Sequence, residues 1–138
     1  MERKDTNPEN PKEAAGRGRI PLHLIPDGPL AWVAMAFHEG ASKYDPYNWR
    51  TAGVRAGTYV AAARRHIAKW WNREDADPVT RVHHLANAVA GLLILMDAEI
   101  QGNLTDDRPP HQGLTELMGR LAEVQKHLSD MAQPGART

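Results

Sequence analysis

The segment Val79–Gln101, VTRVHHLANAVAGLLILMDAEIQ, decides the fold class because its large apolar residues recur at helical spacing. Steps of three or four residues place such side chains on one face of an α-helix. We therefore predict a helix over about 79–101, with this apolar face turned toward the core. The apolar positions are Val82, Leu85, Val89, Leu92, Met96 and Ile100.

Three further segments predict helices. The first follows Asp27 and Gly28, which can cap a helix that has Pro29 in its first turn, and it continues to about Tyr44. A second helix is expected from about Thr58 to Trp71, after a loop with the sequence DPYNWRTAGVRAG. No segment alternates between apolar and polar residues as a strand would. The expected fold is therefore all-α, a four-helix bundle.

The fourth helix, from Leu114 to Met131, has the spacing of a coiled coil. Its large apolar residues are separated by alternating gaps of three and four, and such a stripe with polar flanks packs on a partner helix. We expect it to join a second copy of the chain in a homo-oligomer, a dimer or tetramer, and the alternative is packing on the chain's own core. The stripe is Leu114, Leu117, Leu121, Val124, Leu128 and Met131.

The amino-acid composition argues against several classes of protein. The 138-residue chain has 17 basic and 17 acidic residues, so its formal net charge is zero, which argues against a protein that coats nucleic acid. It has no cysteine and therefore no disulfide or thiolate chemistry. No apolar run reaches the length of a membrane span, so we expect a cytoplasmic protein. Residues 1–17 are expected to be a mobile tail, 18–102 the catalytic helical domain, and 103–138 a linker with the oligomerisation helix.

Acidic residues provide candidate metal ligands. Mg²⁺ and Mn²⁺ prefer carboxylate oxygens that come from several elements, with water or phosphate completing the shell. Glu39 lies late in the first helix, and Glu74, Asp75 and Asp77 cluster after the second. The alternative for that cluster is a solvated turn with helix-capping acids. On the next helix His84 is a further candidate ligand, and its alternative is a local hydrogen bond at the helix start.

Basic, aromatic and amide side chains provide candidate contacts for a nucleotide. Guanidinium and ammonium groups bind phosphate oxygens, and an aromatic face can stack on a nucleobase. The alternative for the basic residues is a solvated face. Because neither a Walker A loop nor a GxGxxG motif occurs, a phosphate site here would not use a glycine loop. The candidates for substrate binding are Lys43, Tyr44, Asn48, Trp49, Arg50, Arg65, Lys69 and Asn87.

Several blocks of these residues resemble a known family. The pattern GRIPLHLIP, FHEGASKYDPYNWR, ARRHIAKWW, EDADP and HHLANAVAGLL, over about residues 18–98, resembles the phage dATP/dGTP diphosphohydrolases, which are all-α relatives of MazG. The resemblance implies hydrolysis of a purine deoxynucleoside triphosphate between its alpha and beta phosphates, giving a monophosphate and pyrophosphate. It also implies two or three Mg²⁺ or Mn²⁺ ions held by carboxylates. A subgroup called MazZ supplies dGMP for 2-aminoadenine nucleotides in phages, and the short chain fits that subgroup.

The chain departs from the MazG pattern at its ligand positions. MazG carries two acids three residues apart on one helix, whereas here His38 precedes Glu39 and no acid occupies Met35 or Ala36. We therefore expect Glu39 and at least one of Glu74, Asp75 and Asp77 as metal ligands, with Glu39, Glu74 and Asp77 as the catalytic acids. His84 and Asn87 are second choices.

Two rival functions remain open at this point. A non-enzymatic helical module that binds nucleotide or nucleic acid would use the arginines as a basic stripe and would form no product. A triphosphohydrolase would release nucleoside and triphosphate, but the adjacent His-Asp pair expected of such an enzyme is missing from HHLANA.

Overall fold

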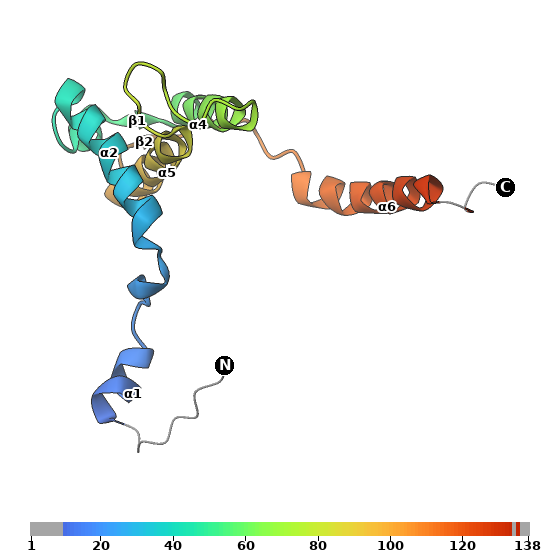
Figure 1. The fold of residues 1–138 in the computed structure, drawn as a ribbon, viewed down its shortest axis with the longest axis horizontal. Coiled ribbons are helices and arrows are strands. Elements are labelled where there is room, and N and C mark those ends of the chain that lie inside the picture. The colour runs from blue at the N-terminus through green and yellow to red at the C-terminus, as the bar shows by residue number, and fades with distance from the viewer. Residues whose placement is uncertain (1–9, 134, 136–138) are drawn as a thin grey trace. The chain divides into compact units, whose positions relative to one another are not determined.

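The computed structural model of the chain describes residues 10–133 and residue 135, and Figure 1 shows its fold. Helices dominate the described residues, which confirms the all-α class. The helices are α1 (Pro11–Arg17), the 3-10 helix η1 (Leu22–Leu24), α2 (Asp27–Tyr44), α3 (Asn48–Ala52), α4 (Ala56–Trp71), α5 (His84–Gln101) and α6 (Leu114–Ala132). Two strands of two residues each, β1 (Val54–Arg55) and β2 (Leu104–Thr105), complete the secondary structure.

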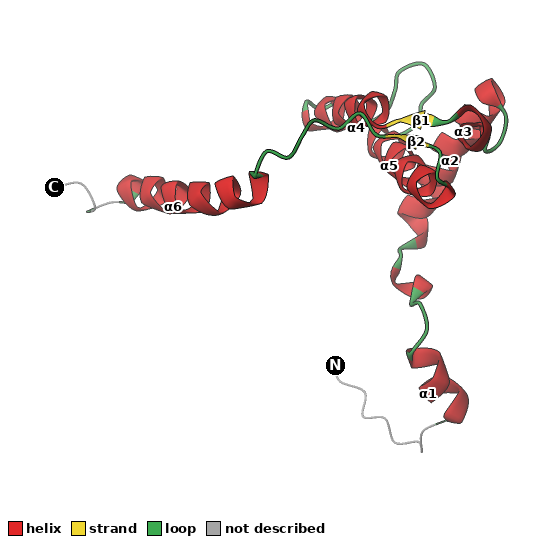
Figure 2. Cartoon of the chain, turned by 180° about the vertical axis from the view of Figure 1, so that it is seen from behind, coloured by secondary structure: helices red, strands yellow, loops and turns green. Residues whose placement is uncertain are grey.

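Helix α5 is the centre of the packed region, and it packs most extensively against α4 and then against α2. The two strands pair in parallel, with Val54 beside Leu104 and Arg55 beside Thr105. Figure 2 shows this pair as two short strands beside α5. The pair joins the segment before α4 to the segment after α5, so it holds the start of α4 beside the end of α5.

Small side chains make up much of the core. Val33 and Ala36 of α2 pack with Val82, Ala86 and Ala90. A second cluster forms around Trp49, Val54 and Ala98, and Phe37 packs against both clusters. Because alanine adds little bulk, its positions on α5 let the neighbouring helices approach closely. The buried alanines of α5 are Ala86, Ala88, Ala90 and Ala98.

The expected start of the helix at Val79 is wrong, because α5 begins at His84. The His83 ring accepts a hydrogen bond from the Leu85 amide, which is the role of an N-cap residue. Upstream, Arg81 has a φ of 64°, a left-handed conformation that interrupts a helix. Residues 79–83 therefore belong to the loop that precedes α5.

The expected apolar face of this helix is also mostly wrong. Val82 is buried, but Met96 is 60% and Ile100 78% exposed, and Val89 and Leu92 are exposed as well. The alanine face of α5 contacts α2 and α4, so the large apolar residues lie on the outside of the single chain.

Two segments expected to lack structure contain short elements. The loop after α2 includes α3 and β1, and α4 begins at Ala56, slightly before the expected Thr58. Within the expected N-terminal tail, residues 11–17 form α1, capped by Asn10, whose side chain accepts from the Lys12 amide. The remainder of that tail, residues 1–9, lies outside the described residues.

The chain divides into two compact units, Met1–Asp106 and Asp107–Thr138. The second unit contains α6, whose six heptad residues are all exposed. The β1–β2 pair places residues 104–105 in the first unit rather than in the linker. Among the described residues, no helix is both long enough and apolar enough to cross a bilayer.

Candidate active site

An open pocket of about 1240 Å³ lies in the first unit and is lined by residues of α2, α3, α4 and α5 and of the turn between α2 and α3. It brings together one expected metal ligand, Glu39, and most of the expected nucleotide contacts. Lys69 is not part of the lining. The expected contacts that line the pocket are Lys43, Tyr44, Asn48, Trp49, Arg50, Arg65 and Asn87.

Glu39 and Lys43 form an ion pair within the pocket. The two residues are one helical turn apart on α2, and Lys43 Nζ lies 2.5 Å from Glu39 Oε1. That oxygen is buried, and the Lys43 ammonium is its polar partner. The Glu39 carboxylate raises the pKa of Lys43 above its ordinary value by hydrogen bonding and by charge. The ammonium group shows that a cation fits against this oxygen.

Asp97 anchors α3 to α5. Its Oδ2 accepts a hydrogen bond of 2.7 Å from the Trp49 indole nitrogen, and both its oxygens bind the Arg50 guanidinium at 2.9 Å. The hydrogen bonds from Arg50 and Trp49 lower the pKa of Asp97 below its ordinary value. Arg50 also lies over the Tyr47 ring, 4.8 Å from its centroid. The polar groups of Trp49 and Arg50 are therefore already engaged in contacts within the chain.

Among the described basic residues that line the pocket, Arg65 is the one without an ion-pair partner. It is exposed, and it comes from α4, whereas Lys43 comes from α2. Cationic groups thus reach the pocket from two helices.

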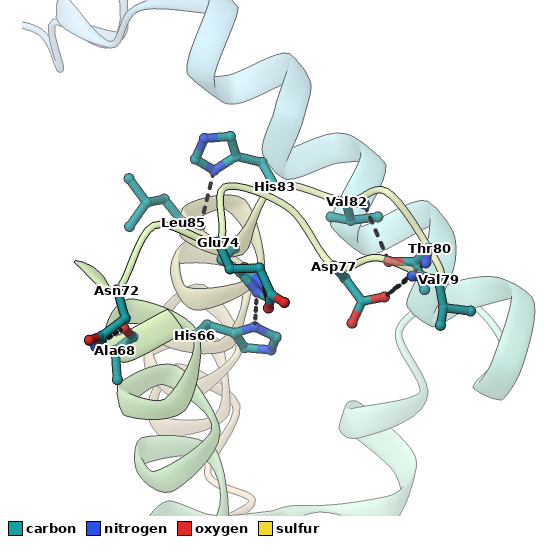
Figure 3. Close-up of polar contacts among 11 residues, drawn as sticks. His66, Ala68, Asn72, Glu74, Asp77, Val79, Thr80, Val82, His83 and Leu85 are labelled. Atoms are coloured by element: carbon teal, nitrogen blue, oxygen red, sulfur yellow. Dashed lines mark hydrogen bonds and ion pairs between the residues drawn. The ribbon is translucent and has the colours of Figure 1, made fainter. Parts of the chain in front are cut away.

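The acidic cluster after α4 does not converge on one point. Asp77 Oδ1 accepts hydrogen bonds of 2.8 Å from the amides of Val79 and Thr80, and these bonds lower the Asp77 pKa. The Asp75 carbonyl oxygen accepts from the His84 amide. These contacts shape the loop between α4 and α5, drawn in Figure 3, and neither Asp75 nor Asp77 lines the pocket.

A hydrogen-bonded chain of three side chains, Glu74, His84 and His66, begins in this loop, and Figure 3 labels its first and last members. Glu74 Oε2 lies 2.6 Å from Nε2 of His84, and His84 Nδ1 lies 2.9 Å from Nδ1 of His66. The His84 side chain is completely buried, whereas the Glu74 side chain is 44% exposed. His66 is the member that lines the pocket.

Sequence reasoning missed both His66 and Asp97. A signal existed for Asp97, since it is a lone carboxylate after the apolar run GLLILM. His66 stands among basic and aromatic residues in ARRHIAKWW, where its spacing alone does not distinguish it. The partners of both residues lie far away along the chain, so local patterns do not identify them.

Within residues 10–133, no group of three or more histidine or acidic side chains is arranged to hold a metal ion by itself. Glu39 is the expected ligand that lines the pocket, whereas Glu74, Asp75, Asp77 and His84 lie outside its lining. Mg²⁺ is commonly bound through one or two carboxylates together with waters and substrate phosphates. The buried Glu39 oxygen, already in contact with a cation, fits this mode of binding.

Comparisons with known proteins agree with the resemblance in the sequence. Residues 9–108 match the family described as dATP/dGTP diphosphohydrolase, N-terminal. A dATP/dGTP diphosphohydrolase of Salmonella phage PMBT28 is 30% identical over 92 residues. The aligned part is 67% of this chain but 31% of that relative, so the chain corresponds to about a third of the relative's length. No solved structure gave a significant match.

Proposed function

This chain belongs to the dATP/dGTP diphosphohydrolase family, and from that premise we propose that its pocket hydrolyses purine deoxynucleoside triphosphates. Cleavage falls between the alpha and beta phosphates of dGTP or dATP and releases a monophosphate and pyrophosphate. The observation that carries the proposal is the meeting of Glu39, Lys43 and Arg65 in one pocket large enough for a nucleotide.

The cationic groups of the pocket suit a triphosphate. Lys43 and Arg65 come from different helices, and they contact the beta and gamma phosphates from two sides. Arg50 has a different role, because its guanidinium already holds both oxygens of Asp97. Tyr44, Asn48 and Asn87 also line the pocket, and they contact the sugar and the base.

Glu39 is the residue that holds Mg²⁺ or Mn²⁺. When the ion is bound, it neutralises phosphate charge and lowers the pKa of a water molecule. With a metal ion on the Glu39 carboxylate, the Lys43 ammonium would be available to a phosphate oxygen. Glu74, Asp75, Asp77 and His84 have no part in metal binding in this proposal, because none of them lines the pocket.

The proposal is tested with the purified full chain, Mg²⁺ or Mn²⁺, and each dNTP, with separation of the products by ion-exchange chromatography. We expect monophosphate and pyrophosphate, complete loss of turnover with EDTA, and a loss of about 10- to 100-fold for Glu39→Gln. Glu99→Gln is the matched control, since Glu99 is exposed on α5 and does not line the pocket. Binding of dGTP without any product would indicate a helical binding module instead.

We further propose that dGTP is the preferred substrate and that the released dGMP supplies 2-aminoadenine nucleotide synthesis in a phage, within the host cytoplasm. The support is the resemblance to the MazZ subgroup and the phage origin of the relative. We expect a kcat/KM for dGTP at least tenfold above that for dATP. A preference for dATP would contradict this assignment.

We also propose that the chain assembles as a homo-oligomer through α6. All six apolar heptad residues of α6 are exposed, and α5 exposes Val89, Leu92 and Met96 on one face. Light scattering should give a mass well above 15.3 kDa, reduced by the pair Leu121→Glu and Leu128→Glu. The pair Ala122→Glu and Ser129→Glu adds the same charge beside the stripe and should leave the mass unchanged. A wild-type monomer would refute the assembly.

A further inference from the structure

The hydrogen bonds that link Glu74, His84 and His66 determine which ring nitrogens of the two histidines carry a proton. An ionised carboxylate only accepts hydrogen bonds, so His84 Nε2 carries the proton that is shared with Glu74 at 2.6 Å. In a neutral His84 ring the other nitrogen, Nδ1, is then an acceptor. Its partner at 2.9 Å, His66 Nδ1, must therefore be the donor.

This order of protons leaves His66 Nε2 as an unprotonated nitrogen. No described residue donates a hydrogen bond to that atom, and His66 belongs to the lining of the pocket. His84 is completely buried, so water does not compete for the bond that orients His66. A neutral imidazole held in a single tautomer, with its lone pair free in a substrate-sized pocket, is the arrangement of a general base.

We propose that His66 is the general base of the reaction and that His84 and Glu74 are positioning residues that fix its tautomer. This inference rests on the proposed function. The His66 Nε2 lone pair takes a proton from the attacking water as that O–H bond breaks. The water oxygen forms its bond to the alpha phosphorus, and the bond between that phosphorus and the bridging oxygen breaks. The electron pair of the broken bond leaves with pyrophosphate.

The surroundings of His66 support this role. Burial is the largest cause that lowers the His66 pKa, the positive charges of Lys69 and Arg65 lower it further, and Asp77 raises it. The net direction is downward, so the ring is neutral at pH 7 and ready to accept a proton. Once His66 is protonated, its positive charge is partly compensated through His84 by the Glu74 carboxylate. The charged and histidine groups that line the pocket or act on His66 from other elements are His38, Glu39 and Lys43 of α2, Asp45 of the following turn, Arg50 of α3, Asp97 of α5, and Glu74 and Asp77 of the loop.

The first test reads the tautomers directly, without catalysis. Long-range ¹H–¹⁵N correlation of the histidine rings in the full chain at pH 7.5 should show His66 protonated at Nδ1 and His84 at Nε2. In Glu74→Gln, the His66 signals should shift, while those of His23, which lies outside the pocket, should not. A His66 ring protonated at Nε2 would overturn the proposal.

The second test is kinetic. We expect His66→Gln to lower kcat by about 100-fold or more, with KM changed less than threefold, because general base catalysis contributes on the order of 10² to 10⁴. Glu74→Gln should lower kcat by roughly 3- to 10-fold and move the acidic limb of the pH profile to lower pH, because the protonated ring loses its compensating charge. His23→Gln is the control and should match the wild type.

The outcomes separate this inference from the proposed function. Monophosphate release that persists in His66→Gln at near the wild-type rate would overturn the role of His66 alone. Absence of monophosphate from the wild-type chain would overturn the proposed function and, with it, the catalytic role. Loss of rate in His66→Gln together with an unshifted pH profile in Glu74→Gln would overturn the positioning role of Glu74.

Discussion

His84→Ala should lower the free energy of unfolding strongly, because it removes a buried side chain and two hydrogen bonds. The His84 ring is completely buried, and both its nitrogens are hydrogen-bonded. Truncating a buried side chain of this size costs about 2–5 kcal/mol when the site does not collapse. His66 Nδ1 also loses its acceptor, which costs up to about 1 kcal/mol more, because His66 is only partly buried and water can replace part of the bond. We expect a total of roughly 2–6 kcal/mol.

Glu74→Ala provides the contrast, since it breaks the same hydrogen bond from the other side. The Glu74 side chain is 44% exposed and fills little buried space, but its removal leaves the buried His84 Nε2 donor without its acceptor, so the cost should be about 1–3 kcal/mol, below that of His84→Ala. Urea unfolding followed by tryptophan fluorescence measures both variants and the double variant. The double variant should match His84→Ala within about 1 kcal/mol. Equal losses for the two single variants, or a loss below about 1 kcal/mol for His84→Ala, would refute this reasoning.

The remaining predictions concern three other positions. Val54→Ala should lower the free energy of unfolding by about 2 kcal/mol in a thermal melt, because Val54 is only 2% exposed and packs between α3 and α5. Arg81→Gly should raise it by roughly 0.5 kcal/mol, since Arg81 has a φ of 64° and glycine adopts that conformation without strain. Asp97 has a lowered pKa, so its stabilisation is complete above the ordinary carboxyl pKa of about 3.9 and is lost as the pH falls toward the lowered value. Asp97→Asn should therefore weaken the protein against urea at pH 7, and its difference from the wild type should shrink as the pH falls below about 3.9.

The four long helices, α2, α4, α5 and α6, could be predicted because their apolar spacing is a local property of the sequence. Which face of α5 is buried could not, because alanines rather than the larger residues contact α2 and α4. The assumption that the largest apolar residues of a helix are the buried ones fails where helices approach closely. It also fails where the exposed face packs on a second chain.

Part of the candidate site was also accessible from sequence. Residues 39–50 are close together along the chain, so Glu39, Lys43 and Asn48 reach one pocket by local geometry. The role of Asp97 depends on Arg50, 47 residues away, and no local pattern encodes that pairing. The acids after α4 were expected to supply a metal ligand, and the structure adds a contact that their spacing did not indicate, since Asp77 Oδ1 accepts two backbone hydrogen bonds.

Hydrolysis of dGTP by the purified chain in ¹⁸O-labelled water, with Mg²⁺ present, tests the central claim most directly. Mass spectrometry of the products locates the bond that breaks and the phosphorus that is attacked. We predict dGMP that carries one ¹⁸O and pyrophosphate that carries none. Label in pyrophosphate or triphosphate, or the absence of any product, would contradict the account.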